Sequence, residues 1–310
     1  MPDEVRQARA VGRGRPGDHT VRGDVPDRGN SRPRRGSRDS FGHPRAARVA
    51  DLRSGGATSG GAAAAGSVRL PAVDAKADYQ LGGAYPPPRG VRVVSRDRTD
   101  TPAVAGYSIC YVNGFQTQPG RLPWWRAHHP RLLLRDRSGV VVRDPGWPGE
   151  VPLDTSTRAR RQTLATIVGR WMRRCARTGF EAVEPDNLDS YSRSRRLLQR
   201  SDNLVTARLF SGQAHDAGLA IAQKNLADLT RRQRLSIGFD FAVAEECAVY
   251  AECGSYRAAY GRHVIEIEYS DNGRAAFARA CRHQGGAWSI VYRDRNLVTP
   301  RSARYVYAAC

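Results

Sequence analysis

Residues 182–224 read AVEPDNLDSYSRSRRLLQRSDNLVTARLFSGQAHDAGLAIAQK, with two short apolar runs on either side of a longer segment of helical periodicity. The runs Ala182–Asp186 and Leu219–Lys224 have the length of buried strands. The segment between them predicts a helix that begins after Asp202 and ends at Gly218, because aspartate favours helix starts and glycine favours helix ends. The stretch therefore predicts a strand–helix–strand unit, the building block of parallel sheets.

The same alternation extends over residues 67–310, whose length is close to the ~250 residues of a (β/α)8 barrel. A second helix is expected after possible N-caps at residues 154–156, ending at Gly179, and a third after Asp271. Eight strands are expected, at residues 78–81, 90–95, 107–112, 182–186, 219–224, 239–245, 263–269 and 287–292. We expect a TIM-type barrel. The competing doubly wound sheet usually offers a GxxxxGK or GxSxG motif, and neither is present.

Residues 1–66 differ from the rest, because they consist mainly of Arg, Gly, Asp, Pro and Ser and lack apolar periodicity. We expect this prefix to be disordered. Its GRGRPG at residues 12–17 matches GxGxxG, but no strand precedes it and no helix pattern follows, which indicates a chance match. No apolar core of a secretory signal is visible. A start codon placed too far upstream would explain such a prefix.

The composition says little about partners. The net charge is +20, yet all but Lys76 and Lys224 of the 50 basic residues are arginines, which is typical of a GC-rich genome. We expect no nucleic-acid partner, although binding through residues 1–66 is an alternative that predicts a steep salt dependence. No apolar run reaches the roughly 18 to 20 residues of a bilayer span, so we expect no membrane partner.

Ionisable or polar residues end four of the expected strands, where the active sites of such barrels lie. They are Glu184 and Asp186, Lys224 and Asn225, Glu245 and Glu246, and Glu266 and Glu268. Crowded carboxylates separate one another's pKa values, so one can donate a proton while another stays ionised. The pattern predicts acid/base chemistry, and the alternative is that these groups only pair with arginines or cap helices. The histidines show no metal-ligand spacing, so we expect neither metal nor cofactor.

In the VIEIEY run at residues 264–269, glutamates and isoleucines occupy opposite faces of a strand. We expect Glu266 and Glu268 to face the barrel interior while Ile265 and Ile267 pack under the helices.

Four ordered motifs resemble glycoside hydrolase family 114, the endo-alpha-1,4-polygalactosaminidases. The motifs are GFEAVEPDNLDSY at residues 179–191, AHDAGLAIAQKN at 214–225, FAVAEECAVYAEC at 241–253 and EIEY at 266–269. The resemblance extends over nearly all of residues 78–310. It implies a (β/α)8 barrel that cleaves alpha-1,4-linked galactosamine or N-acetylgalactosamine polymers internally, usually outside the cell.

The resemblance maps the catalytic carboxylates to Asp186 and Glu245, which would act as nucleophile and general acid/base of a retaining mechanism. The strand pattern alone leaves Glu245 and Glu246 open. The family often has Asn before this glutamate, where this chain has Ala244, so a polar contact is expected to be missing. The expected substrate-binding residues are Glu184, Asn187, Lys224, Asn225, Glu268, Tyr111 and Trp147. A catalytically silent carbohydrate-binding barrel is the alternative.

Six cysteines without a CxxC pair exclude a zinc ribbon and a thioredoxin motif. We expect disulfides Cys247–Cys253 and Cys281–Cys310, with Cys110 and Cys175 as free core thiols. The alternative is six reduced cysteines in a cytosolic protein. A disulfide beside Glu245 favours an oxidising compartment, and we expect an extracellular monomer.

Overall fold

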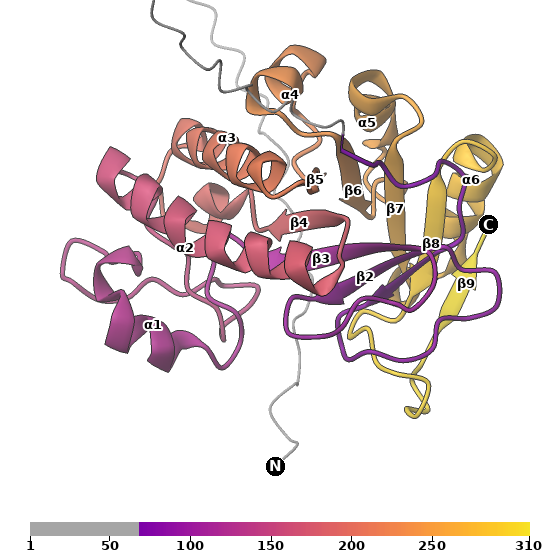
Figure 1. The fold of residues 1–310 in the computed structure, drawn as a ribbon, viewed down its shortest axis with the longest axis horizontal. Coiled ribbons are helices and arrows are strands. Elements are labelled where there is room, and N and C mark those ends of the chain that lie inside the picture. Colours follow the sequence, from indigo (N-terminus) through magenta and orange to yellow (C-terminus); the bar gives the residue numbers. More distant parts are fainter. Residues whose placement is uncertain (1–67) are drawn as a thin grey trace, which may run out of the picture. The chain divides into compact units, whose positions relative to one another are not determined.

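The computed structural model describes residues 68–310, so the expectations for residues 1–66 lie outside the described part of the chain. Its centre is a nearly closed barrel whose strands pair in sequence order (Figure 1). The parallel strands are β1 (Ala77–Gln80), β2 (Val93–Asp97), β3 (Tyr107–Asn113), β4 (Ala182–Asp186), β5 (Ala220–Lys224), β6 (Phe241–Glu245), β7 (Val264–Tyr269) and β8 (Ser289–Arg293). The expected (β/α)8-type barrel is confirmed.

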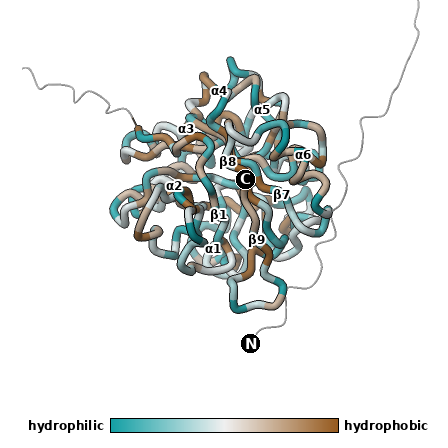
Figure 2. The backbone as a smooth tube through the Cα atoms, turned by 90° about the vertical axis from the view of Figure 1, so that its right-hand side faces the viewer, coloured by the Kyte–Doolittle hydropathy of each residue, from teal (hydrophilic) through white to brown (hydrophobic). Residues whose placement is uncertain are grey.

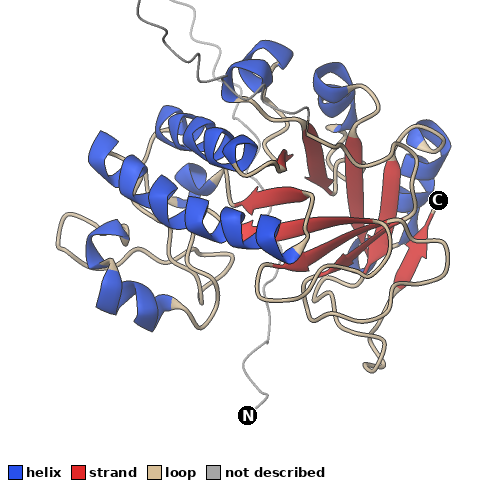
Figure 3. Cartoon of the chain, in the orientation of Figure 1, coloured by secondary structure: helices blue, strands red, loops and turns tan. Residues whose placement is uncertain are grey.

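Helices lie on the outer side of the strands (Figure 3). They are α1 (Leu122–His128), α2 (Arg158–Thr178), α3 (Arg200–Asp216), α4 (Arg231–Ile237), α5 (Cys253–Tyr260) and α6 (Arg274–Gln284), with 3-10 turns η1 (Pro130–Leu132), η2 (Ser190–Arg193) and η3 (Ser270–Asn272). Between β1 and β3 the described chain has no helix. The proline run at residues 86–88 lies in the first of these two connections, where it disfavours helix formation.

The helix α2 shows how local sequence sets helix ends. Thr157 is its N-cap and accepts a hydrogen bond from the Arg160 backbone N–H (3.3 Å), one residue beyond the expected caps. Gly179 ends the helix with φ of 99°, a left-handed conformation that glycine adopts without steric cost, as expected. The helix packs against α3, and both cover β3 to β5.

Side chains alternate between the barrel interior and the helical layer. One apolar cluster contains residues from all eight parallel strands, including Tyr79, Val243 and Ile267, and fills the interior. A second contains Val183 and Ile221 and joins the outer strand faces to the helices. Hydrophobic and hydrophilic residues therefore interleave along the backbone (Figure 2). None of the helices within residues 68–310 has the length and apolar content needed to cross a bilayer.

Side-chain contacts between β8 and β1 close the barrel. Arg293 is fully buried there, and its Nη1 donates to Asp78 Oδ1 (2.7 Å). Its Nε donates to the Val306 carbonyl (3.0 Å), which anchors the C-terminal segment. That segment adds a ninth strand, β9 (Tyr307–Ala309), antiparallel to β8. It was not expected, because three residues are too short to show a periodicity.

Three disulfides connect the described chain. Cys247–Cys253 and Cys281–Cys310 confirm two expectations. The expectation that Cys110 and Cys175 are free thiols is wrong, because they form a disulfide with a Cα–Cα distance of 6.2 Å. Cys110 belongs to the outer face of β3 and Cys175 to the buried face of α2, so helix packing brings them together.

Candidate active site

Asp186, Lys224 and Glu245 are the last residues of β4, β5 and β6, three adjacent parallel strands. Lys224 Nζ lies between the two carboxylates, 3.4 Å from Asp186 Oδ1 and 3.4 Å from Glu245 Oε2. These two carboxylate oxygens are therefore at most twice that distance apart, about 7 Å. The carboxylate side chains are partly exposed, 18% and 23%, whereas the lysine side chain is 1% exposed.

Lys224 is the cation at the base of this site. Its Nζ also lies 3.0 Å from Glu184 Oε1 and donates to the Tyr79 hydroxyl (2.9 Å). Burial by itself lowers the pKa of a lysine, but Asp186, Glu245 and Glu184 outweigh this effect and raise its pKa well above the usual value. Lys224 therefore stays charged. With so little exposed surface, it acts on the carboxylates electrostatically.

Glu184 precedes Asp186 by two residues on the same face of β4 and is completely buried. The Tyr79 hydroxyl donates to Oε1 (2.5 Å) and the Ser95 hydroxyl to Oε2 (3.3 Å). Burial raises its pKa to about 7, although Lys224 opposes the shift. Glu184 was expected to bind substrate, but it has no exposed surface for a sugar. The structure places it beneath the site as a partner of Lys224.

Asp186 is held as a carboxylate by the groups around it. Tyr111 donates its hydroxyl to Oδ2 (2.7 Å), and the backbone N–H of Asn187 donates to Oδ1 (2.7 Å). Burial raises the pKa of Asp186, but Lys224 and these hydrogen bonds outweigh it and lower the pKa below its usual value. Asn187 has φ of 66°, so the chain turns away directly after the strand. Asp186 is thus ionised and aimed by fixed donors.

Glu245 is fixed by two residues from neighbouring strand ends. Asn225 donates its amide to Oε2 (2.8 Å) and accepts from the backbone N–H of Glu245 (2.9 Å), while Tyr269 donates to Oε1 (2.6 Å). Glu246 leaves the strand with φ of 60° and pairs with Arg295 (2.5 Å). The structure therefore distinguishes the two glutamates: only Glu245 shares a site with Asp186 and Lys224.

Ala244 belongs to the outer apolar cluster and is completely buried. A side chain at this position faces the helices, so the expectation that Ala244 removes a polar contact from the site is wrong.

One flank of the site is a polar network that the sequence did not reveal residue by residue. Asn113 donates to Glu150 Oε2 (3.0 Å), and Gln116 donates to Asp144 Oδ2 (2.7 Å), which also accepts from Arg193 Nε (2.5 Å). The long segment after β3 supplies most of these residues. The sequence marked none of its polar side chains, because loops carry no periodicity.

Asn187 joins this flank to Asp186. Its amide donates to Asn113 Oδ1 (2.9 Å) and its Oδ1 accepts from Arg193 Nη2 (2.8 Å). Burial raises the pKa of Glu150 to about 8, against the hydrogen bond from Asn113. Trp147 is 48% exposed in the same loop, where its backbone carbonyl accepts from the Glu150 N–H (2.8 Å). An exposed ring of this kind can stack on a sugar.

The expectation that Glu266 and Glu268 face the barrel interior is wrong. Ile265 and Ile267 belong to the interior cluster, so the two glutamates point to the helical layer. Glu268 is 1% exposed and accepts from the Ala248 backbone N–H (3.0 Å), away from Asp186. The alternation was read correctly, but its two faces were exchanged.

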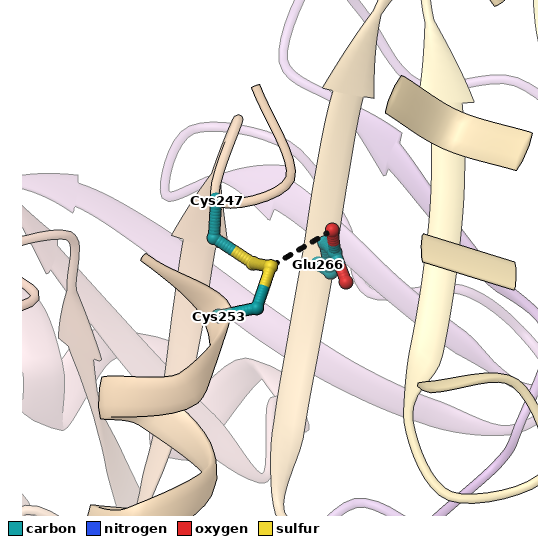
Figure 4. Close-up of side chains that lie close together, drawn as sticks. All are labelled: Cys247, Cys253 and Glu266. Carbon is teal, nitrogen blue, oxygen red and sulfur yellow. Dashed lines mark hydrogen bonds between the residues drawn. A yellow bond between two sulfur atoms is a disulfide. The ribbon is translucent and has the colours of Figure 1, made fainter. Parts of the chain in front are cut away.

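Figure 4 shows Glu266 beside Cys247 and Cys253, within range of a shared metal ion. Both sulfurs are bonded to each other in the disulfide. They are therefore not thiolates, the form in which cysteine binds metals.

The barrel is similar in fold to known glycoside hydrolases. The model of glycoside-hydrolase family GH114 matches residues 57–310. The solved structure of Ega3 from Aspergillus fumigatus, in complex with galactosamine, has a TM-score of 0.62 at 23% identity and covers 78% of this chain and 97% of that one. A variant of the glycoside hydrolase domain of PelA from Pseudomonas aeruginosa has a TM-score of 0.52 at 14% identity and covers 74% and 97%. No curated protein matched by sequence.

At these identities the two solved structures support the fold, while the family match spans the whole barrel and the residues at its mouth. The chain belongs to glycoside hydrolase family GH114.

Proposed function

We propose that this protein is an endo-acting glycoside hydrolase that cleaves polymers of alpha-1,4-linked galactosamine or N-acetylgalactosamine. The family match and the likeness to Ega3, whose structure contains galactosamine, support this substrate class. The observation that carries the proposal is the pair of partly exposed carboxylates, Asp186 and Glu245, on either side of the buried cation Lys224.

Asp186 serves as the nucleophile, because its lowered pKa keeps it ionised. It attacks the anomeric carbon while Glu245 protonates the departing glycosidic oxygen, and a covalent glycosyl-enzyme forms. Glu245 then removes a proton from water, which hydrolyses the intermediate. The upper limit of about 7 Å includes the separation of about 5 to 5.5 Å found in retaining pairs and excludes most of the inverting range of about 6.5 to 9.5 Å, so the geometry is compatible with this retaining route.

The sugar contacts come from the residues around the pair. Asn187 and Asn225 offer amides next to the two carboxylates, and Tyr111 places its hydroxyl on Asp186. Trp147 provides an exposed ring on the flank formed by the segment after β3. The polar groups orient the hydroxyls and the amine, and the ring covers an apolar sugar face.

The test is the release of reducing ends from an alpha-1,4-galactosaminogalactan. We expect a rapid fall in chain length, as internal cleavage requires, and products whose initial anomeric form, read by NMR, is alpha. An inverted first product would contradict retention. If the polymer binds without being cut, and Asp186→Asn binds it equally well, the catalytically silent barrel is the correct description.

A monomer that works outside the cell is part of this proposal. The three disulfides support an oxidising compartment. Peptide mapping of protein recovered from culture medium, without reduction, should find all three pairs. Free thiols at these six positions, or a dimer in light scattering, would contradict it.

A further inference from the structure

Glu266 and Glu268 form an acid pair behind the active site, on the outer face of β7. The two residues are 0% and 1% exposed, and the Oε2 atom of each is buried without a hydrogen-bond partner. Side chains two residues apart lie on one strand face, so the two carboxyl groups can share a proton. Burial and the charge of Glu268 raise the pKa of Glu266 to about 9, and a hydrogen bond between the two carboxyls adds to the shift.

The contact with the disulfide agrees with this protonation state. Glu266 Oε1 lies 3.5 Å from Cys253 Sγ (Figure 4). A disulfide sulfur has no hydrogen to donate, so it cannot stabilise a carboxylate there. A neutral Glu266 carboxyl group that donates a hydrogen bond to Glu268 avoids placing a second charge in this apolar layer.

The acid pair touches the segment that directly follows the catalytic strand. Glu268 Oε1 accepts from the Ala248 backbone N–H (3.0 Å), and Arg279 Nη2 donates to the Ala248 carbonyl (2.9 Å). The backbone N–H and the carbonyl of Ala248 are therefore both hydrogen-bonded by side chains that lie outside the barrel. The segment comprises residues 246–253, and the Cys247–Cys253 disulfide closes it.

The same segment begins one residue after Glu245. Glu246 adopts φ of 60° and its N–H donates to the Ile267 carbonyl (2.7 Å), so the chain turns outward at the end of β6. On the inner side Asn225 and Tyr269 hold the Glu245 carboxylate. A shift of residues 246–253 would move the backbone of Glu245 relative to these donors.

We propose that Glu268, which lies beside Glu266 on the outer face of β7, is a positioning residue for the acid/base Glu245, acting through the Ala248 backbone. This inference rests on the proposed function. It assigns to the outer face of β7 a role in catalysis without contact with the sugar. A variant that lacks the contact between Glu268 and Ala248 should lose acid/base assistance, seen as a lower kcat, rather than substrate binding, seen as a higher KM.

The test compares Glu268→Leu, which leaves the Ala248 N–H without its acceptor, with Glu268→Gln, which keeps an acceptor oxygen. We expect Glu268→Leu to lower kcat on the polymer about 10-fold or more with KM within about two-fold, and Glu268→Gln to stay within about three-fold of the parent. On an activated aryl glycoside, which leaves with little proton assistance, Glu268→Leu should lose much less.

The matched control is Glu181→Leu. Glu181 also accepts from a backbone N–H, that of Ser108 (2.6 Å), but it precedes β4 at the opposite end of the barrel. We expect this variant to lose stability and to keep the kcat values of the parent on both substrates. Equal losses in the Glu181→Leu and Glu268→Leu variants would overturn the proposal, as would parental kcat in folded Glu268→Leu.

Arg279→Met decides the matter if Glu268→Leu fails to fold, because it releases the Ala248 carbonyl and leaves the acid pair in place. We expect Arg279→Met to lower kcat on the polymer about three-fold and to lower kcat on the aryl glycoside much less. Glu245→Gln separates the two proposals. If Glu245→Gln loses as much kcat on the aryl substrate as on the polymer, the assignment of Glu245 fails. If Glu245→Gln retains more kcat on the aryl substrate but Arg279→Met and Glu268→Leu do not, only the positioning role of Glu268 fails.

Discussion

The strands β4 and β7 each carry two carboxylates two residues apart, and the barrel uses them in opposite ways. Glu184 and Asp186 of β4 face the interior, where Lys224 lies within 3.4 Å of both. Glu266 and Glu268 of β7 face the helical layer and meet the disulfide and the Ala248 backbone. The same sequence spacing thus supplies the proposed nucleophile in one strand and a buried pair of glutamates in the other.

The difference is the presence of a cation. Beside Lys224 the pKa of Asp186 is lowered in spite of burial, while the pKa of Glu266, without such a partner, rises to about 9. Burial penalises the charged form in both places, but only the β4 pair lies beside a buried ammonium group, that of Lys224 on β5, to offset it. Lys224 therefore keeps Asp186 ionised, whereas burial without such a cation favours the neutral form of Glu266.

The largest effect is expected at the inward-facing pair. Asp186→Asn removes the proposed nucleophile, so kcat should fall by about 10⁴-fold or more on polymer and aryl substrates alike. The measurement is the steady-state rate on both substrates, with polymer binding as the control for folding. A variant that keeps more than about a hundredth of the parental rate would remove Asp186 from its assigned role.

Replacing the cation tests the electrostatic explanation directly. Lys224→Met keeps the length of the side chain but leaves three carboxylates without a positive partner. We expect kcat to fall about 10²- to 10³-fold and the free energy of unfolding to fall by about 3 to 5 kcal/mol, as for a broken buried ion pair. Raised carboxylate pKa values should also move the acid limb of the pH–rate profile upward.

Arg161→Met provides the control for Lys224→Met. Arg161 pairs with Asp202 (3.2 Å) outside the barrel, where the two side chains keep 17% and 20% of their exposure, whereas Lys224 keeps 1%; the loss of Arg161 should cost about 1 kcal/mol and leave the pH profile unchanged. Similar stability losses in both variants would contradict the importance of burial.

A smaller, pH-dependent effect is expected at Glu184. Its pKa is raised to about 7, so it is ionised and pairs with Lys224 above pH 7 and is neutral well below it. Glu184→Gln mimics the neutral form. We expect kcat about 10-fold below the parent at pH 8 and no difference at pH 5.5, measured on the aryl glycoside. A deficit that persists at pH 5.5 would indicate a structural rather than an electrostatic effect.

The smallest effect on catalysis is expected at Glu266, where the change should appear in stability. Its pKa rises from about 4.5 when unfolded to about 9 when folded, so its contribution to stability is fully present below pH 4.5 and is lost as pH rises towards 9. Glu266→Gln removes this loss. We expect its Tm to exceed that of the parent by several degrees at pH 8.5 and to match it at pH 4, by calorimetry.

Glu266→Gln should keep parental kcat on both substrates, because glutamine can still donate to Glu268. A Tm difference that does not change with pH would mean that Glu266 is ionised in the folded protein, and the contrast with β4 would then disappear.

The strand ends could be read from the sequence with good accuracy, and so could the residues placed on them. Asp186, Lys224 and Glu245 meet because adjacent parallel strands bring their last residues together. Glu150 and Asp144 could not be found in this way, because they lie in the segment after β3, whose path follows no period. The Cys110–Cys175 disulfide was missed for a related reason: it depends on how α2 lies on β3.

The sequence by itself determined the order of strands and helices, the family, and the carboxylates at the strand ends, because these depend on local apolar periodicity and on motif spacing. Only the tertiary structure decided which face of each strand points inward, and with it which carboxylates lie beside Lys224. An alternating pattern is symmetric with respect to the two faces. In β7 both faces are buried, so the isoleucines fill the interior and the glutamates lie outside it, where burial raises the pKa of Glu266.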